Sequence, residues 1–245
     1  MNVFVKLFIM KKFILFCLIF FCVSSVFAQN YRVQSPYDAK INVDSEKTLF
    51  ILDFSNSMNE YLNSRKKLDI MLDTMREILP KINPQKQVGM RAYGYRIGLT
   101  PFDSCKASKL FVPITKGGST MISRQIEKTR AIGMTPITYS LKSALTKDFN
   151  EFYGLKHIIL LTDGGENCDE SPCKFMTKNL KYYPNLKIDV IAYDIRNSDD
   201  ISQLQCVALV TRGKFYTANT MAELLDSLNN SLNIEKEVEG KILLP

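Results

Sequence analysis

Three separate segments of the sequence place oxygen-bearing side chains where strands or turns end. The stretch "LFILDFSNSMNE" runs apolar residues into Asp53 and then puts Ser55 and Ser57 at alternate positions. The stretch "HIILLTDGGEN" ends a second apolar run at Asp163, and "AIGMTPITYSL" places Thr135 in a Gly/Pro turn. Carboxylate and hydroxyl oxygens without nearby His or Cys suit a hard divalent ion. These five side chains therefore predict a Mg²⁺ site, with Mn²⁺ as an alternative ion.

Four of these five residues also have a simpler structural interpretation. Ser55 or Ser57 could cap a following helix. Asp163, followed by two glycines, could belong to a tight turn. Thr135 precedes a proline and could cap another helix. Because a hydroxyl or carboxylate at one such position is common, it is their joint occurrence at expected strand ends that favours a shared metal site.

The elements that must position these residues follow from apolar periodicity. Apolar, β-branched runs predict six strands, at residues 48–53, 87–93, 109–113, 157–162, 187–193 and 214–217. Segments of helical period lie between most of them, which predicts an α/β fold with a doubly wound, mostly parallel six-stranded sheet and helices on both faces. The connection before "KLFVP" has no helical period, so this short strand is expected to run antiparallel at one edge. Ligands of such sheets bind beyond the carboxyl ends of the strands.

The order and spacing of these residues resemble those of a known family. Asp53-x-Ser55-x-Ser57, Thr135 and Asp163 are similar, in order, to the metal-ion-dependent adhesion site of von Willebrand factor A (VWA) domains. "GMTPI" and "TDGGEN" resemble the turns of that family, and the cysteine set is similar to that of a secreted bacterial branch. The resemblance implies a VWA, Rossmann-like fold. It also implies that the serines bind the ion directly, the threonine directly or through water, and the aspartates largely through water.

The N-terminal residues predict an address outside the cytoplasm. Met10, two lysines and an apolar run lead to Val26-Phe27-Ala28, the pattern of a cleaved signal peptide over residues 1–28, with a retained signal anchor as the alternative. An extended lead-in (29–47), a VWA domain (48–232) and a C-terminal tail (233–245) are expected to follow. The protein is then periplasmic, or secreted to the medium or cell surface, and has no membrane span after signal cleavage.

Four cysteines remain after signal removal, and an even number suits disulfides in an oxidising compartment. The short separation in "CDESPC" favours Cys168–Cys173, which would leave Cys105 to pair with Cys206. Topology argues against that second bond, so a bond from Cys105 to one member of "CDESPC", with the other joined to Cys206, stays open as the alternative. A zinc site built from these four thiolates is weakly supported, because two of the cysteines are isolated and the only histidine is His157.

Composition excludes several classes of function. The 245 residues are 46% hydrophobic, enough for one domain with a substantial core. The formal net charge of +7 falls to 29 − 25 = +4 without residues 1–28, and no basic cluster interleaved with aromatics points to nucleic acid. Phe54, Asn56 and Met58 occupy the turn where a dinucleotide-binding loop needs glycines. His157 enters an apolar strand and is expected to be structural.

These features predict a non-catalytic module for binding and adhesion. The divalent ion would accept an Asp or Glu carboxylate from a protein partner, since hydroxyl ligands leave coordination positions for an incoming group. A metal-assisted hydrolase of phosphoesters is one alternative, because two aspartates and a divalent ion could activate water. A structural envelope protein with a silent metal site is the other.

Overall fold

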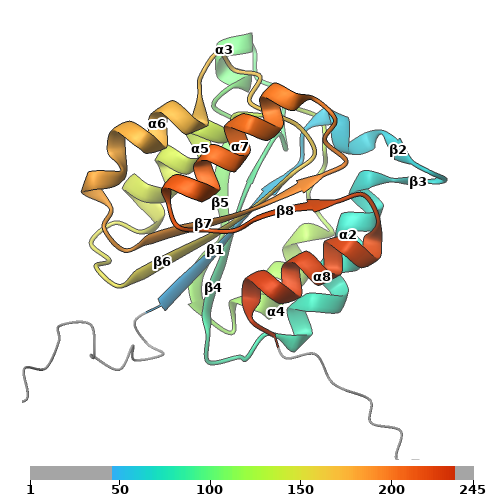
Figure 1. Ribbon diagram of the computed structural model, residues 1–245. Helices are drawn as coiled ribbons and strands as arrows, with labels where there is room; N and C mark the ends of the chain where they lie inside the picture. Colours follow the sequence, from blue (N-terminus) through green and yellow to red (C-terminus); the bar gives the residue numbers. More distant parts are fainter. Residues whose placement is uncertain (1–45, 235–245) are drawn as a thin grey trace, which may run out of the picture. The chain divides into compact units, whose positions relative to one another are not determined.

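The computed structural model describes residues 46–234, which form a six-stranded sheet with helices on both faces (Figure 1). The strand order is β5-β4-β1-β6-β7-β8, and all neighbouring strands are parallel except β4 and β5. The sheet strands are β1 (Glu46–Asp53), β4 (Gln87–Tyr93), β5 (Ser108–Lys116), β6 (Leu155–Thr162), β7 (Leu186–Tyr193) and β8 (Phe215–Ala218). This arrangement confirms the predicted fold class.

Helices and short turns connect these strands. The helices are α2 (Lys67–Ile78), α3 (Pro101–Ser104), α4 (Gly118–Ile126), α5 (Ile137–Ser143), α6 (Pro172–Asn179), α7 (Ser198–Val210) and α8 (Met221–Leu232). The other helical segments are the short 3₁₀ helices η2 (Asn56–Asn59), η3 (Leu79–Lys81) and η5 (Leu180–Tyr182) and the π-helix η4 (Ala144–Asp148). A small antiparallel hairpin is made by β2 (Tyr61–Leu62) and β3 (Arg65–Lys66). The hairpin was not predicted, because two-residue strands leave no periodic signal.

The edge strand β5 is antiparallel as expected but longer than the five residues "KLFVP". It spans nine residues and continues past Pro113. The register between β4 and β5 shifts between Val88 and Met90, opposite this proline. Proline is tolerated in an edge strand at such a bulge, where its missing N–H removes no ladder hydrogen bond. The strand therefore continues through Pro113, where the sequence pattern predicted its end.

Two apolar cores lie on opposite faces of the sheet. Figure 1 shows α2, α4 and α8 on one face and α5, α6 and α7 on the other. Along β1, Phe50 and Leu52 join the first core, whereas Leu49 and Ile51 join the second. All four are fully buried, because alternate side chains of a strand point to opposite faces and both faces are covered. This double burial explains the unbroken apolar run before Asp53.

A buried polar cluster includes His157. Its Nε2 lies 3.0 Å from Asp189 Oδ2 and its Nδ1 lies 3.5 Å from Glu46 Oε1. Ser231 of α8 donates a hydrogen bond to the same Asp189 oxygen at 2.7 Å. Burial opposes ionisation of Asp189, but the hydrogen bonds from His157, the Lys214 backbone and Ser231 hold its pKa well below the usual range. The imidazole is thus satisfied by carboxylates and ties β1, β6, β7 and α8 together, as expected of a structural histidine.

Several predicted segments lie outside the described residues. These are the signal peptide (1–28), all but the last two residues of the lead-in (29–47), and all but the first two of the tail (233–245). Between residues 46 and 234, no helix is both long enough and apolar enough to cross a bilayer.

Candidate metal site

Asp53, the last residue of β1, lies fully buried at the centre of the candidate site. Its Oδ1 accepts a hydrogen bond from the Ser55 backbone N–H at 2.7 Å. Its Oδ2 accepts hydrogen bonds from the Tyr93 hydroxyl at 2.9 Å and the Thr162 hydroxyl at 2.8 Å. Burial raises the pKa of Asp53, and these hydrogen bonds oppose the rise. Asp53 therefore holds the turn after β1 against the ends of β4 and β6.

Ser55, Ser57 and Asp163 form a continuous chain of oxygens across two strand ends. The two serine hydroxyl oxygens are 2.9 Å apart, and the Ser57 hydroxyl donates to Asp163 Oδ1 at 2.7 Å. Ser55 stands at the N-cap of η2 but makes no side-chain capping bond, so the capping interpretation does not describe its hydroxyl. Ser55 and Asp163 are buried, and Ser57 is partly exposed. The cluster thus reaches solvent at Ser57.

Thr135 lies in a segment that joins both strand ends. Two residues earlier, Gly133 pairs with Ser55 in an isolated bridge, and its carbonyl accepts the Asn56 N–H at 2.9 Å. The Thr135 backbone N–H donates to the Asn167 side-chain carbonyl at 2.7 Å, four residues after Asp163. Pro136, rather than Thr135, occupies the N-cap of α5, so the capping interpretation fails for Thr135 too. The structure therefore places the Thr135 segment beside the other four residues.

Gly94, at the end of β4, allows these turns to approach closely. Its φ is +71°, and a Cβ there would lie 2.5 Å from the Ser55 backbone nitrogen. Its carbonyl accepts hydrogen bonds from the N–H groups of Ile132 and Gly133 at 3.1 and 2.7 Å. Any side chain at Gly94 would both clash and adopt a disfavoured backbone conformation.

Lys67, the first residue of α2, is a charged neighbour that the sequence did not predict. Its side chain is 5% exposed, and its Nζ lies 3.1–3.3 Å from carboxylate oxygens of Glu60, Asp163 and Asp194. Burial lowers the pKa of Lys67, but the charge of Asp163 and the hydrogen bonds to all three carboxylates raise it overall. Asp163 therefore directs Oδ1 to Ser57 and Oδ2 to Lys67. A lysine at the start of a helix is unfavourable to the helix dipole, and this was the only sequence feature that pointed to a nearby negative charge.

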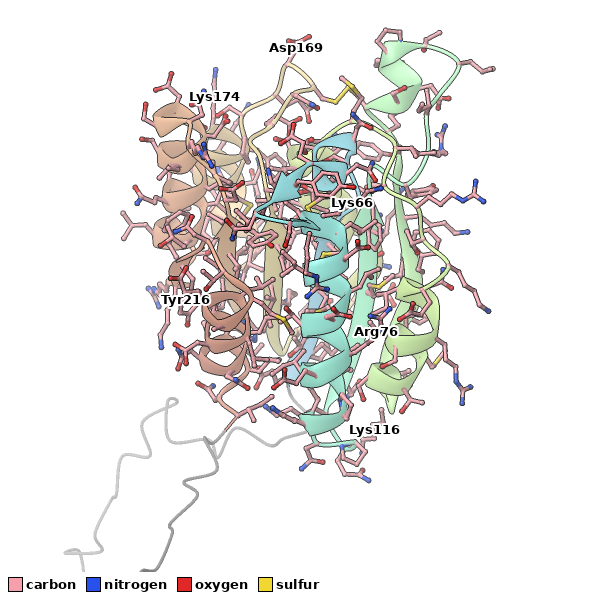
Figure 2. All side chains as sticks on the ribbon, turned by 90° about the vertical axis from the view of Figure 1, so that its right-hand side faces the viewer. Lys66, Arg76, Lys116, Asp169, Lys174 and Tyr216 are labelled. Carbon is pink, nitrogen blue, oxygen red and sulfur yellow. A yellow bond between two sulfur atoms is a disulfide. The ribbon has the colours of Figure 1, made fainter. Side chains whose placement is uncertain are left out.

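The described residues hold two disulfides, but the preferred pairing was wrong. The bonds are Cys105–Cys168 and Cys173–Cys206, which is the form left open as the alternative. Cys173 lies in the first turn of α6, which packs against α7 and Cys206, whereas Cys168 lies in the loop before α6. Figure 2 shows a disulfide near Asp169, at the same end of the sheet as Lys66 and opposite Lys116.

The donor set fits a hard divalent ion better than a soft one. All four cysteines of the described residues are oxidised, which removes the thiolate zinc site. Residues 46–234 hold no group of three or more His, Cys, Asp or Glu side chains arranged for a metal. The converging oxygens of Ser55, Ser57 and Asp163 are what remains, and oxygen donors suit Mg²⁺ or Mn²⁺.

Binding of Mg²⁺ is expected to weaken as the solution is acidified. Burial and the charge of Asp53 raise the pKa of Asp163 to about 6, against hydrogen bonds from Ser57 and Lys67. Below this pKa the ion must displace a proton, so its affinity should fall by up to about tenfold per pH unit. Calorimetric titration with Mg²⁺ between neutral pH and about pH 5 measures this. If the Mg²⁺ affinity did not change over that pH range, the assignment of Asp163 to the site would be contradicted.

The raised pKa of Asp163 has the opposite effect on the folding stability of the metal-free protein. Above the raised pKa, Asp163 is ionised in both the folded and the unfolded chain. Between about pH 6 and pH 4 only the folded carboxyl takes up a proton, so this group increases folding stability as the pH falls through that window. Protonation of Asp163 should therefore stabilise the metal-free fold while it disfavours metal binding.

Comparisons with known proteins agree on one family. The sequence profile described as von Willebrand factor type A domain matches residues 49–231. The uncharacterised protein YwmC of Bacillus subtilis (strain 168) is 24% identical over 178 residues, which cover 71% of this chain and 77% of that protein.

Two solved structures show the same fold. Proximal thread matrix protein 1 from the mussel byssus, in a structure with a zinc-occupied MIDAS motif, is 21% identical with a TM-score of 0.58 over 76% of this chain and 44% of its own. This chain therefore spans less than half of the byssus protein. The vWF domain of the type V pili tip protein Mfa5 from Porphyromonas gingivalis is 14% identical, with a TM-score of 0.59 over 78% of this chain and 96% of that one. With the profile match over most of its length, the chain belongs to the von Willebrand factor type A domain family.

Proposed function

We propose that this protein is a secreted, non-catalytic binding module whose divalent-cation site captures an acidic side chain of a protein partner. Mg²⁺ is the expected ion, with Mn²⁺ as the alternative. The observation that carries the proposal is the chain of hydroxyl and carboxylate oxygens from Ser55 through Ser57 to Asp163, which reaches solvent at the strand ends. The presence of a pili tip protein and a zinc-occupied MIDAS among the structural relatives supports it.

The roles of the residues follow from their positions. When bound, the ion supplies positive charge and free coordination positions for an incoming carboxylate. Ser55 and Ser57 would hold it through neutral hydroxyl oxygens, which leave more of its charge for the partner than carboxylates would. Asp53 orients the serine turn through the Ser55 N–H, and Thr162 and Tyr93 keep its other oxygen engaged. Asp163 would act through Oδ1, because Lys67 contacts Oδ2.

Partner capture from envelope extract tests the proposal. Immobilised protein should retain the same partner in Mg²⁺ or Mn²⁺ and release it in EDTA. Blocking the partner's carboxylates by amidation should also abolish retention. Retention that survives both EDTA and amidation would refute a metal-bridged carboxylate, and turnover of generic phosphoesters would refute a non-catalytic role.

Thr135→Ala is expected to weaken partner capture while it leaves a folded, metal-competent domain. A partner carboxylate adds negative charge at the ion, and a neutral hydroxyl is then a better companion ligand than another carboxylate. Thr135 should therefore matter more in the partner-bound state than in the free one, and a group affects binding only through that difference. The expected loss is about 1–3 kcal/mol, or roughly 5- to 150-fold in affinity.

The comparison needs matched Mg²⁺ saturation and a control for loss of a threonine hydroxyl. Thr146→Ala is suitable, because Thr146 lies exposed in η4 and its hydroxyl donates to the Lys142 carbonyl at the end of α5. Partner affinity should be unchanged in this control. Equal partner affinity of wild type and Thr135→Ala would remove Thr135 from the mechanism.

A further inference from the structure

The loop between β4 and β5, residues 94–107, presents three large apolar side chains to solvent. Leu99 is 100% exposed, Phe102 71% and Ile97 68%. We call these three residues the apolar crown. Single exposed apolar residues are common on soluble proteins, but three within one short loop are the kind of feature that marks an interaction surface.

The exposure does not arise from a loosely organised loop. The Arg96 guanidinium donates to both carboxylate oxygens of Asp103, at 2.8 and 3.0 Å. Asp103 also accepts the Leu99 N–H at 3.1 Å, and Thr100 caps α3 by accepting the Asp103 N–H at 3.1 Å. The Gly98 N–H donates to the Ser104 hydroxyl at 2.9 Å. A surface already ordered before binding loses little conformational entropy when a partner docks.

The loop that carries the apolar crown, residues 94–107, contacts the candidate metal site at two points. The Cys105–Cys168 disulfide links the end of α3 to the residue after Asn167, whose side chain holds the Thr135 backbone. A Cβ on Gly133 would lie 2.4 Å from the Arg96 carbonyl oxygen, so the loop also packs against the segment before Thr135. In Figure 1, α3 stands beyond the ends of β1 and β6 from which the candidate ligands come. One partner could thus contact both features.

The loop 94–107 that carries the crown has a small net positive charge of its own. Lys106 Nζ lies 3.8 Å from the centroid of the Phe102 ring. The charge of Arg96 is matched by Asp103, so these three groups sum to 2 − 1 = +1. A cation beside an aromatic ring raises the local positive potential at the apolar surface.

From these observations we infer that the apolar crown is the second half of the partner-binding surface. Its occupant is a protein segment in which an Asp or Glu lies near bulky apolar residues. The carboxylate of that segment engages the metal site, and the apolar side chains pack on Leu99, Phe102 and Ile97. This inference rests on the proposed function for the carboxylate half, whereas the apolar half stands on the crown alone.

A random peptide library displayed on phage supplies defined probes. The purified full chain is panned in Mg²⁺, and the enriched peptides are synthesised and their affinities measured by fluorescence polarisation. The expected peptides combine an acidic residue with bulky apolar ones. EDTA should abolish their binding, and Leu99→Ser and Phe102→Ser should each weaken it by about tenfold, as for residues at the centre of an interface.

Leu209→Ser is the matched control. Leu209 is also a highly exposed leucine, at 78%, but it lies near the end of α7, so its substitution should leave peptide affinity unchanged. Thermal unfolding of each variant establishes that the fold is kept.

The outcomes separate the two halves of the surface. Acidic, EDTA-sensitive peptides that bind both crown variants as well as wild type would overturn the crown and leave the proposed function standing. Apolar peptides that need the crown but neither an acid nor Mg²⁺ would overturn the proposed function and the joint surface. Absence of any enriched peptide would overturn both. Crown-dependent binding to vesicles of phosphatidylcholine and phosphatidylglycerol, or crown-dependent self-association in sedimentation, would replace the protein partner and so overturn the inference.

Discussion

Lys67→Met is expected to bind Mg²⁺ more tightly than wild type while its metal-free form loses much of its stability. The ammonium lies within 3.3 Å of carboxylates from Asp163, Asp194 and Glu60 in a buried position. Removing one partner of a buried ion pair leaves the other charge uncompensated, which typically destabilises a protein by about 3–5 kcal/mol. The same removal takes a positive charge away from the cation site. Mg²⁺ affinity should then rise by about ten- to a hundredfold.

Lys66→Met is the matched control for this effect. Lys66 precedes Lys67 at the same helix end, so its substitution changes the net charge equally, but its side chain is only partly buried. Its effects on stability and Mg²⁺ affinity should be small. Lys67→Arg retains the charge, so its Mg²⁺ affinity should stay close to that of wild type; Lys67→Gln removes the charge but keeps a polar group, and it serves if Lys67→Met fails to fold. Denaturant unfolding and calorimetry provide the two readouts, and weaker or unchanged Mg²⁺ binding in Lys67→Met would contradict this role.

Asp53 substitutions should have the largest effect on metal binding. Asp53→Ala removes the acceptor of the Ser55, Tyr93 and Thr162 hydrogen bonds together with its charge, and should abolish Mg²⁺ binding. Asp53→Asn keeps the shape, but its amide turns a donor toward groups that themselves donate. Loss of such an orienting group typically reduces metal affinity by about 10- to 100-fold, and loss of the carboxylate charge adds to this.

The control must change an aspartate elsewhere in the same end of the molecule. Asp169 is exposed, and its φ of +59° is one that asparagine tolerates well, so Asp169→Asn is matched to Asp53→Asn. Mg²⁺ affinity should be unchanged in Asp169→Asn. If both Asp53 variants bound Mg²⁺ with wild-type affinity, the ion would not bind at this strand end.

The fold and the position of the candidate site were predictable because they rest on short-range pattern and simple topology. The apolar run before Asp53 indicated a strand buried on both faces, and β1 proved to lie next to β6. Neighbouring parallel strands bring their carboxyl ends together, so Ser57 and Asp163 meet although 106 residues separate them. Metal binding by these residues stays a prediction.

The features that were missed depend on packing between distant segments. Closeness in sequence favoured Cys168–Cys173, but α6 begins at Pro172 and turns Cys173 toward α7. The contacts of Lys67 with Asp163 and Asp194 join residues from separate elements, which no local pattern encodes. A basic residue at the start of a helix was only a weak hint of a nearby negative charge.

The most direct test of the central claim is the location of Mn²⁺ in crystals of the protein grown with that ion. An anomalous difference map should show one strong peak between the strand ends, within coordination distance of the Ser55 and Ser57 hydroxyl oxygens, with Thr135, Asp53 and Asp163 around it. The peak should disappear in crystals of Asp53→Ala. A map at saturating Mn²⁺ without a peak at this position, or with its only strong peak elsewhere, would contradict the account.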